Sequence, residues 1–144
     1  MNFQRLTDTL VRHEGSHILE GRHRLYKCTA GKETIGYGRN LTDRGISEGE
    51  AKTLLHNDIQ DSINEVRDKL YWFDSLDDVR QEVIVNMAFN LGVPGLMKFR
   101  NTIGYIEEGE YGMAAQEMLN SQWAAQVGYR AQELSRMMAS GVAE

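Results

Sequence analysis

The strongest constraint on the fold is a long run of apolar residues at helical spacing between residues 51 and 70. The run keeps one face of an α-helix apolar over about six turns, and its members are Ala51, Leu54, Leu55, Ile59, Ile63, Val66 and Leu70. Ser47 and Glu50 precede it in a capping-box pattern. The sequence therefore predicts a helix over residues 47–70, and a helix this long in a 144-residue chain typically spans two lobes.

A first helix is predicted at the N-terminus. Phe3, Leu6 and Leu10 recur at helical spacing, and Gly15 is a typical stop. Glu14 then falls at the C-terminal end of this helix, where the helix dipole disfavours a carboxylate. Such a carboxylate needs a partner, a raised pKa caused by burial, or full solvation.

Short strands are predicted between this first helix and the long one. Residues 16–25 fit no period and are expected to form a loop. Tyr26–Cys28 and Glu33–Tyr37 are predicted as two strands around a Gly-containing turn, and residues 39–41 as a third. A tight hairpin here would bring side chains on either side of the turn close together.

Everything after the long helix is predicted to be helical. A strong apolar period follows Asp74 and runs to Leu91, where Gly92 ends it. Shorter helices are predicted near residues 101–107, 110–119 and 129–139.

These elements predict one α+β domain, residues 1–144, built from two lobes. A small hairpin-bearing lobe is expected at 13–46, and an all-helical lobe at 1–12 plus 74–144, with helix 47–70 between them. The fractions of charged (26%) and hydrophobic (41%) residues are those of a soluble globular protein, and the single cysteine cannot form an internal disulfide.

The net charge and the hydropathy of the chain argue against two classes of binding partner. The net charge of −5 argues against general nucleic-acid binding, which needs clustered Lys and Arg. No apolar run reaches the length of a membrane span, and the N-terminus has no basic region followed by an apolar one. We expect a monomer without membrane insertion that is synthesised in the cytoplasm.

Three residues could perform glycoside hydrolysis. That reaction needs a proton donor for the leaving oxygen and a second group near the oxocarbenium-like centre. Glu14 could be the donor, and Cys28 with Thr34 could form the second group, because six positions separate them across the predicted turn. A non-catalytic module that holds glycan is the alternative.

The segment His13-Glu14-Gly15-Ser16-His17 offers a different chemistry. It matches the H-E-x-x-H pattern of zinc hydrolases, with His23 as a possible third ligand. The pattern requires both histidines on one helical face, yet Gly15 lies between them. A zinc hydrolase therefore stays a weaker alternative, and we expect neither metal nor cofactor.

Four motifs in order resemble the phage endolysin lysozymes of the T-even type, glycoside hydrolase family 24. They are HEG, YKCTAGKETIGYGRNLT, SEGEAKTLLHNDI and DSLDDVRQEVIVNMAFNLG, and the likeness extends from Phe3 to about Gly141. The resemblance implies a lysozyme-like α+β fold. It also implies cleavage of the β-1,4 bond between N-acetylmuramic acid and N-acetylglucosamine in peptidoglycan.

The resemblance also implies roles for single residues. Glu14 matches the catalytic acid, Cys28 stands where relatives have Asp or Cys, and Thr34 matches the Thr that completes the catalytic group. We expect Cys28 and Thr34 to position the attacking water, with inversion at the anomeric carbon. A thiolate nucleophile, which would give retention, is the rival.

The remaining implied residues concern substrate binding. Arg130 resembles the arginine that pairs with the catalytic glutamate. Phe89 and Asn90 would face the cleft, and Gln122 lies in a substrate-contact segment. The resemblance further implies action on the host cell wall after the membrane is permeabilised.

This chain departs from the family pattern in its spacing. Relatives leave eight residues between the acid and the Asp or Cys, whereas thirteen residues separate Glu14 from Cys28. Residues 16–21 therefore resemble an insertion. Glu20 is the alternative acid, but we favour Glu14 because the apolar period of the first helix ends there. Gln122, where some relatives carry Arg, and the acidic net charge are further departures.

Overall fold

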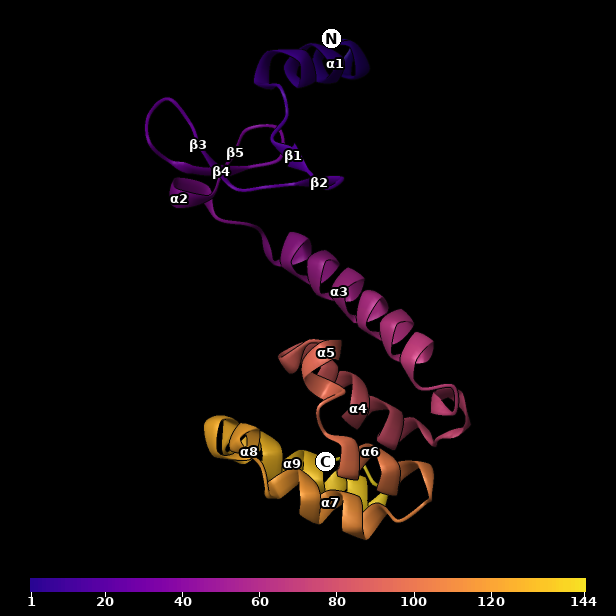
Figure 1. The fold of residues 1–144 in the computed structure, drawn as a ribbon. Coiled ribbons are helices and arrows are strands. Elements are labelled where there is room, and N and C mark those ends of the chain that lie inside the picture. The colour runs from indigo at the N-terminus through magenta and orange to yellow at the C-terminus, as the bar shows by residue number, and fades with distance from the viewer. The chain divides into compact units, whose positions relative to one another are not determined.

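A computed structural model describes all residues from 1 to 144. The chain forms two compact units, Met1–Thr53 and Leu54–Glu144, which are described separately below. The secondary structure combines helices with small antiparallel sheets, as the α+β prediction expected (Figure 1). No helix has both the length and the apolar character needed to cross a membrane.

Helix α1 (Phe3–Glu14) opens the first unit and confirms the predicted N-terminal helix. The Asn2 side chain caps its start by accepting a hydrogen bond from the Arg5 backbone N–H at 2.8 Å. Gly15 ends it with a φ of 67°, a conformation that favours glycine. The helix buries none of its residues, and the assignment of residues 1–12 to the helical lobe stays a prediction.

Residues 16–25 do not form the predicted loop. Strands β1 (Ile18–Leu19) and β2 (Arg22–His23) pair as an antiparallel hairpin. Glu20 and Gly21 make its turn with φ of 54° and 76°. Two consecutive left-handed residues are what a tight two-residue hairpin turn requires.

The predicted second hairpin and its third strand are confirmed. Strands β3 (Tyr26–Lys27), β4 (Glu33–Ile35) and β5 (Arg39–Asn40) form one antiparallel sheet in the order β3-β4-β5. Thr34 pairs with Tyr26 on one side and with Asn40 on the other.

Two helices follow this sheet. The short α2 (Leu41–Arg44) was not predicted, whereas α3 (Glu48–Lys69) is the predicted long helix. Its capping box is formed in both directions: the Ser47 backbone N–H donates to Glu50 Oε1 at 2.8 Å, and the Glu50 N–H donates to Ser47 Oγ at 3.1 Å.

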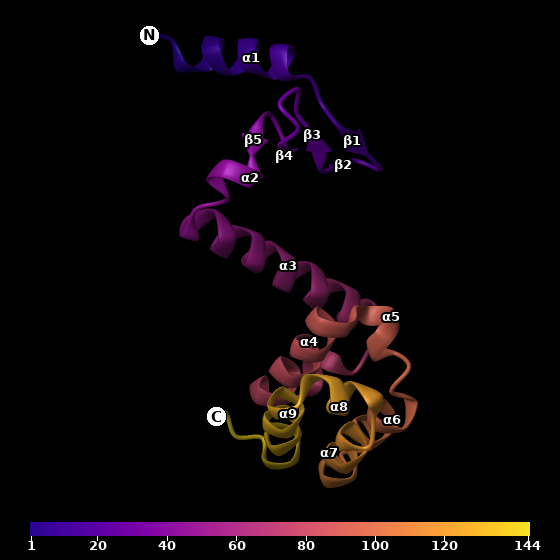
Figure 2. The same ribbon diagram turned by 90° about the vertical axis from the view of Figure 1, so that its left-hand side faces the viewer.

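The second unit continues from α3 into a cluster of helices (Figure 2). A 3-10 turn at Phe73–Ser75 precedes α4 (Asp78–Leu91), which ends at Gly92 as predicted. The later helices are α5 (Val93–Leu96), α6 (Arg100–Glu107), α7 (Tyr111–Leu119), α8 (Gln122–Val127) and α9 (Tyr129–Ser140). Of these, α6, α7 and α9 confirm the predicted short helices, while α5 and α8 were not predicted.

The hydrophobic core belongs to the second unit. Its fully buried side chains come mainly from α4, α7 and α9, and the largest are Val66, Val83, Ile84, Met87, Met118 and Met138. In Met1–Thr53, by contrast, Thr34 is the only buried residue. Turns, caps and short ladders therefore hold the first unit together.

Candidate active site

The Glu14 carboxyl group lies against the backbone of Gly38. A Cβ atom added at Gly38 would come within 3.0 Å of Glu14 Cδ, and within 3.1 and 3.2 Å of its two carboxyl oxygens. Gly38 also has a φ of 90° and directly precedes β5. The last residue of α1 thus lies at the edge of the β3-β4-β5 sheet. The structure does not bury Glu14, which is exposed at the end of a helix that buries none of its residues.

Cys28 lies at the start of a tight turn between β3 and β4. Its backbone N–H donates to the Lys32 carbonyl at 3.0 Å, and the Gly31 N–H donates to the Cys28 carbonyl at 2.8 Å. The backbone N–H groups of Lys32 and Ala30 stabilise the thiolate form of this residue. Together with the Thr34 hydroxyl, they hold the pKa of the Cys28 thiol below its ordinary value.

Thr34 meets Cys28, as the hairpin prediction expected. The Thr34 side chain is buried, and its hydroxyl donates to the Lys32 carbonyl at 2.8 Å. The same hydroxyl also contributes, after the backbone N–H groups, to lowering the pKa of the Cys28 thiol. Since a hydroxyl has one proton, it can donate to the carbonyl or to a thiolate, but not to both at once. The Cys28 charge state and the Thr34 hydrogen bond are therefore coupled.

Glu20, the alternative acid, lies elsewhere on this unit. It is the first residue of the β1–β2 turn, and its side chain is 83% exposed. Its nearest cation is Arg24, with 3.9 Å between the charged atoms. The contact between Glu14 and Gly38 has no counterpart at Glu20, so Glu14 is the better candidate.

The zinc-hydrolase alternative is contradicted by the backbone. A H-E-x-x-H site needs one helix that carries both histidines, but α1 ends at Glu14 and Gly15 leaves the helical conformation. The His17 ring instead stacks on Tyr26, with 3.7 Å between the ring centroids. His13 and His17 therefore do not share a helical face.

Two of the candidate binding residues lie at a cavity of about 560 Å³ in the second unit, lined by α3, α4 and α9. Phe89 lines it and is 44% exposed. Arg130 also lines it, and its guanidinium donates twice to Asn86 Oδ1, at 2.7 and 2.9 Å. Asn86 thus fixes the direction of Arg130. The pairing of Arg130 with Glu14 stays a prediction.

The other two candidates lie near Trp123. Asn90 Oδ1 accepts a 2.7 Å hydrogen bond from the Trp123 indole N–H, which satisfies the polar atom of a buried tryptophan. Gln122 is exposed and lines a second cavity of about 460 Å³ between α6, α7 and α8. Ser121 caps α8 by accepting from the Ala124 N–H, which sets the start of that helix next to this cavity.

Two further residues shape these sites, and the sequence indicates one of them. Gly36 and Gly38 in T-I-G-Y-G predict a twisted or closely approached strand, and at Gly38 the approaching group is Glu14. Asn86 gave no such signal, since its contact with Arg130 joins positions 44 residues apart.

Comparison with known proteins agrees with this structure. The sequence model of the phage lysozyme family matches residues 17–139. The chain is 26% identical to "Probable T4-type lysozyme 2" of Dictyostelium discoideum over an alignment of 165 residues, which covers 94% of each protein. It is also 26% identical to "Probable T4-type lysozyme 1" of the same organism, over 76% of this chain and 68% of that protein.

The family match starts after Glu14, so the candidate role of that residue rests on its contact with Gly38. The match does cover the hairpin that joins Cys28 to Thr34, the long helix α3 and nearly all of the helical unit. The chain therefore belongs to the phage lysozyme family, with the lysozyme-like α+β fold that the sequence predicted.

Proposed function

We propose that this protein is a muramidase that hydrolyses the β-1,4 bond between N-acetylmuramic acid and N-acetylglucosamine in peptidoglycan. Membership of the phage lysozyme family and the lysozyme names of two relatives support this activity. The observation that carries the proposal is the arrangement in Met1–Thr53. Glu14 lies against Gly38, at the edge of the same small sheet in which Cys28 meets Thr34.

In the proposed reaction, Glu14 is the general acid. Its carboxyl proton passes to the glycosidic oxygen as the bond to the anomeric carbon breaks. The contact with Gly38 restricts where the carboxyl group can lie, which is what a proton donor needs in order to meet one particular oxygen.

Cys28 and Thr34 position the attacking water in this mechanism. The Thr34 hydroxyl and the Cys28 sulfur lie together, so one water can contact both. The lowered pKa of Cys28 favours the thiolate, which can accept the water proton as a base. Water attack opposite the leaving oxygen gives inversion.

The stereochemistry of the product separates this mechanism from its rival. A thiolate that attacks the anomeric carbon itself would form a covalent intermediate and give retention. We expect proton NMR of the first product to show the inverted anomer. A retained anomer would overturn water positioning and make Cys28 the nucleophile.

The second unit is proposed to supply substrate contacts through Phe89, Asn90, Gln122 and Arg130. Phe89 and Gln122 are exposed beside cavities, so a sugar or peptide could reach them. Asn90 and Arg130 are already held by Trp123 and Asn86. Their proposed contribution is therefore a fixed polar surface.

A wall-lysis assay tests the activity itself. The purified protein should lower the turbidity of a peptidoglycan suspension and release new reducing ends. The alternative, a non-catalytic module, predicts that the protein sediments with peptidoglycan while no reducing ends appear. Sedimentation without release would therefore refute the muramidase proposal.

The proposed biological role, that of an endolysin, rests on the family resemblance. We propose that the protein accumulates in the cytoplasm of a bacterial host and reaches the wall after the membrane is permeabilised. Cells that express it should stay intact until chloroform is added and should then lyse, whereas cells expressing Glu14→Gln should not. Lysis without permeabilisation would contradict this order of events.

A further inference from the structure

The β1–β2 hairpin overlaps residues 16–21, which resemble an insertion, and the structure ties it firmly to the first unit. It begins four residues after Glu14. The Arg24 backbone N–H donates to the His17 carbonyl at 2.8 Å, which extends the ladder beyond the paired strands. The hairpin is thus an ordered structure with two defined faces.

Cross-strand pairing decides which side chains share a face. Leu19 is opposite Arg22, and the backbone bond between His17 and Arg24 continues the same alternation. His17, Leu19, Arg22 and Arg24 therefore form one side of the hairpin, which we call the hairpin face. All four are exposed, so the face is open to a ligand.

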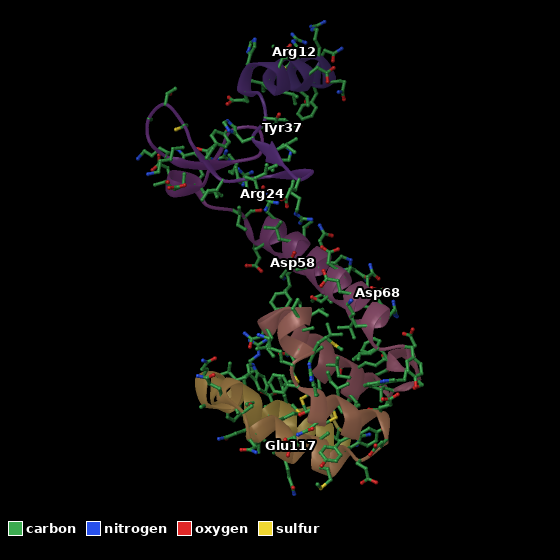
Figure 3. All side chains as sticks on the ribbon, viewed as in Figure 1. Arg12, Arg24, Tyr37, Asp58, Asp68 and Glu117 are labelled. Atoms are coloured by element: carbon green, nitrogen blue, oxygen red, sulfur yellow. The ribbon has the colours of Figure 1, made fainter.

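The opposite side anchors the hairpin near the candidate acid. His23 meets the Tyr37 ring edge-on, with 4.9 Å between centroids. Tyr37 directly precedes Gly38, the residue against which Glu14 rests. Arg24 and Tyr37 are labelled in Figure 3, on the part of the chain between α1 and α2.

A stacked pair of rings connects the hairpin face to the β3-β4-β5 sheet. The His17 and Tyr26 rings are nearly parallel, at 15°, with 3.7 Å between centroids. Tyr26 is paired with Thr34, so the two side chains share one face of the sheet, and Cys28 follows two positions after Tyr26. The hairpin face is therefore continuous with the residues proposed to hold the attacking water.

The hairpin face is positively charged and only weakly neutralised. Arg22 makes no salt bridge, and Arg24 has only a 3.9 Å contact with Glu20 and a hydrogen bond to the Leu19 carbonyl. Residues 1–53 contain nine Lys and Arg against seven Asp and Glu, whereas residues 54–144 contain seven against fourteen. Positive charge in this acidic protein is thus concentrated in the unit that holds Glu14.

We propose that the hairpin face is an added substrate subsite that binds the carboxylates of the wall peptides attached to the glycan strand. This rests on the proposed muramidase function. The occupant follows from charge and position: two guanidinium groups on one side of a hairpin suit carboxylates. The ring stack places them beside the sheet at which the glycan is cut. Leu19, on the same face and 64% exposed, offers an apolar contact to the peptide.

The double variant Arg22→Gln/Arg24→Gln tests this subsite on two substrates. One is intact peptidoglycan, and the other is glycan from which an amidase has removed the peptides. On intact peptidoglycan we expect KM to rise about three- to tenfold, as for the loss of two exposed ion pairs. We expect kcat on intact peptidoglycan to stay at the value of the parent protein. On stripped glycan, both KM and kcat should equal those of the parent.

Two further variants control for charge and for folding. Arg22→Lys/Arg24→Lys keeps both charges and should recover most of the binding. Arg44→Gln removes one exposed cation from α2, away from the hairpin, and should match the parent protein. Salt should weaken the binding of the parent to intact peptidoglycan more than that of the double Gln variant.

Several results would overturn the subsite. If the double Gln variant lost as much binding to stripped glycan as to intact peptidoglycan, the two arginines would have a structural role. If Arg44→Gln lost as much binding as the double variant, the attraction would be nonspecific. Unchanged wall binding with lost binding to anionic phospholipid vesicles would make a membrane the occupant. Sedimentation with intact and with stripped peptidoglycan measures binding to the subsite without any catalysis. An inactive parent protein would therefore refute the muramidase proposal and leave this binding test valid.

Discussion

The Glu14 carboxyl group lies against the backbone of Gly38, in the space that a side chain at position 38 would enter. A Cβ at position 38 would lie 3.0 to 3.2 Å from three atoms of the carboxyl group. Glycine is therefore favoured here for two separate reasons: its φ of 90°, and the carboxyl group of Glu14, which would have to shift to make room for a Cβ atom.

Gly38→Ala should damage activity far more than stability. Displacement of the proposed acid by even about 1 Å can cost on the order of a hundredfold in rate. Gly36→Ala is the matched control, because Gly36 has a φ of 66° but nothing within 4 Å of an added Cβ. Both variants should lose about 1–2 kcal/mol of unfolding free energy from backbone strain. Equal activities of the two folded variants would disprove the spatial role of Gly38.

Glu14→Gln should fold normally, bind peptidoglycan and lose about 10²- to 10⁴-fold in wall lysis, because Gln keeps the shape but cannot deliver a proton. Glu20→Gln should stay within a few-fold of the parent, since Glu20 is an exposed turn residue. One turbidity assay, with circular dichroism as the folding check, measures both. If Glu20→Gln were inactive while Glu14→Gln remained active, the general acid would be Glu20 in the β1–β2 hairpin.

Thr34→Val should raise the pKa of Cys28 and reduce activity. The buried side chain keeps its shape in Val, but the hydroxyl that helps to stabilise the thiolate is lost. The rate of iodoacetamide alkylation against pH reports this pKa directly, since Cys28 is the only cysteine. Thr53→Val, which removes a hydroxyl from α3, should leave the profile unchanged. An unshifted profile in Thr34→Val would rule out this contact.

Glu50→Gln should change how stability depends on pH. Arg39 forms a two-pronged ion pair with Glu50, at 2.6 and 2.7 Å, and with the Ser47 N–H it lowers the pKa of Glu50 to about 2. This stabilisation is fully present above the ordinary Glu pKa of about 4.3 and is lost as the pH falls through about 2. The Tm difference between the parent and Glu50→Gln should therefore shrink over that window.

Glu48→Gln is the control for this titration. Glu48 lies two residues earlier, at the start of α3, with its side chain 80% exposed and only a 3.8 Å contact to Lys52. Its Tm should follow that of the parent at every pH. If the Tm difference between Glu50→Gln and the parent stayed constant from pH 7 to pH 2, the proposed link between Glu50 protonation and stability would be contradicted.

Local signals in the sequence predicted the parts of the fold that local chemistry decides. The long helix followed from one apolar period and from the Ser47–Glu50 capping box, and the structure contains both. The β3–β4 hairpin followed from the Gly-containing turn, and this placed Cys28 beside Thr34.

The parts that were missed depend on unusual backbone or on distant partners. The β1–β2 hairpin turns at Glu20, a glutamate with positive φ, where the common hairpin signals are Asn-Gly and Asp-Gly. Helix α8 has only six residues, too few to show a period. The bond between Asn90 and Trp123 joins positions 33 apart, and no single sequence reveals such a pair.

The uneven burial of the two units has a consequence for how the protein responds to warming. Met1–Thr53 buries only Thr34, so its short ladders can open locally, while the amides of α4, α7 and α9 are protected by the core. Amide hydrogens of β3, β4 and β5 should therefore exchange with solvent much faster than those of the core helices. On heating, lysis should fail at a lower temperature than the one at which helical ellipticity falls. The working temperature of the proposed muramidase would then be set by its least buried 53 residues.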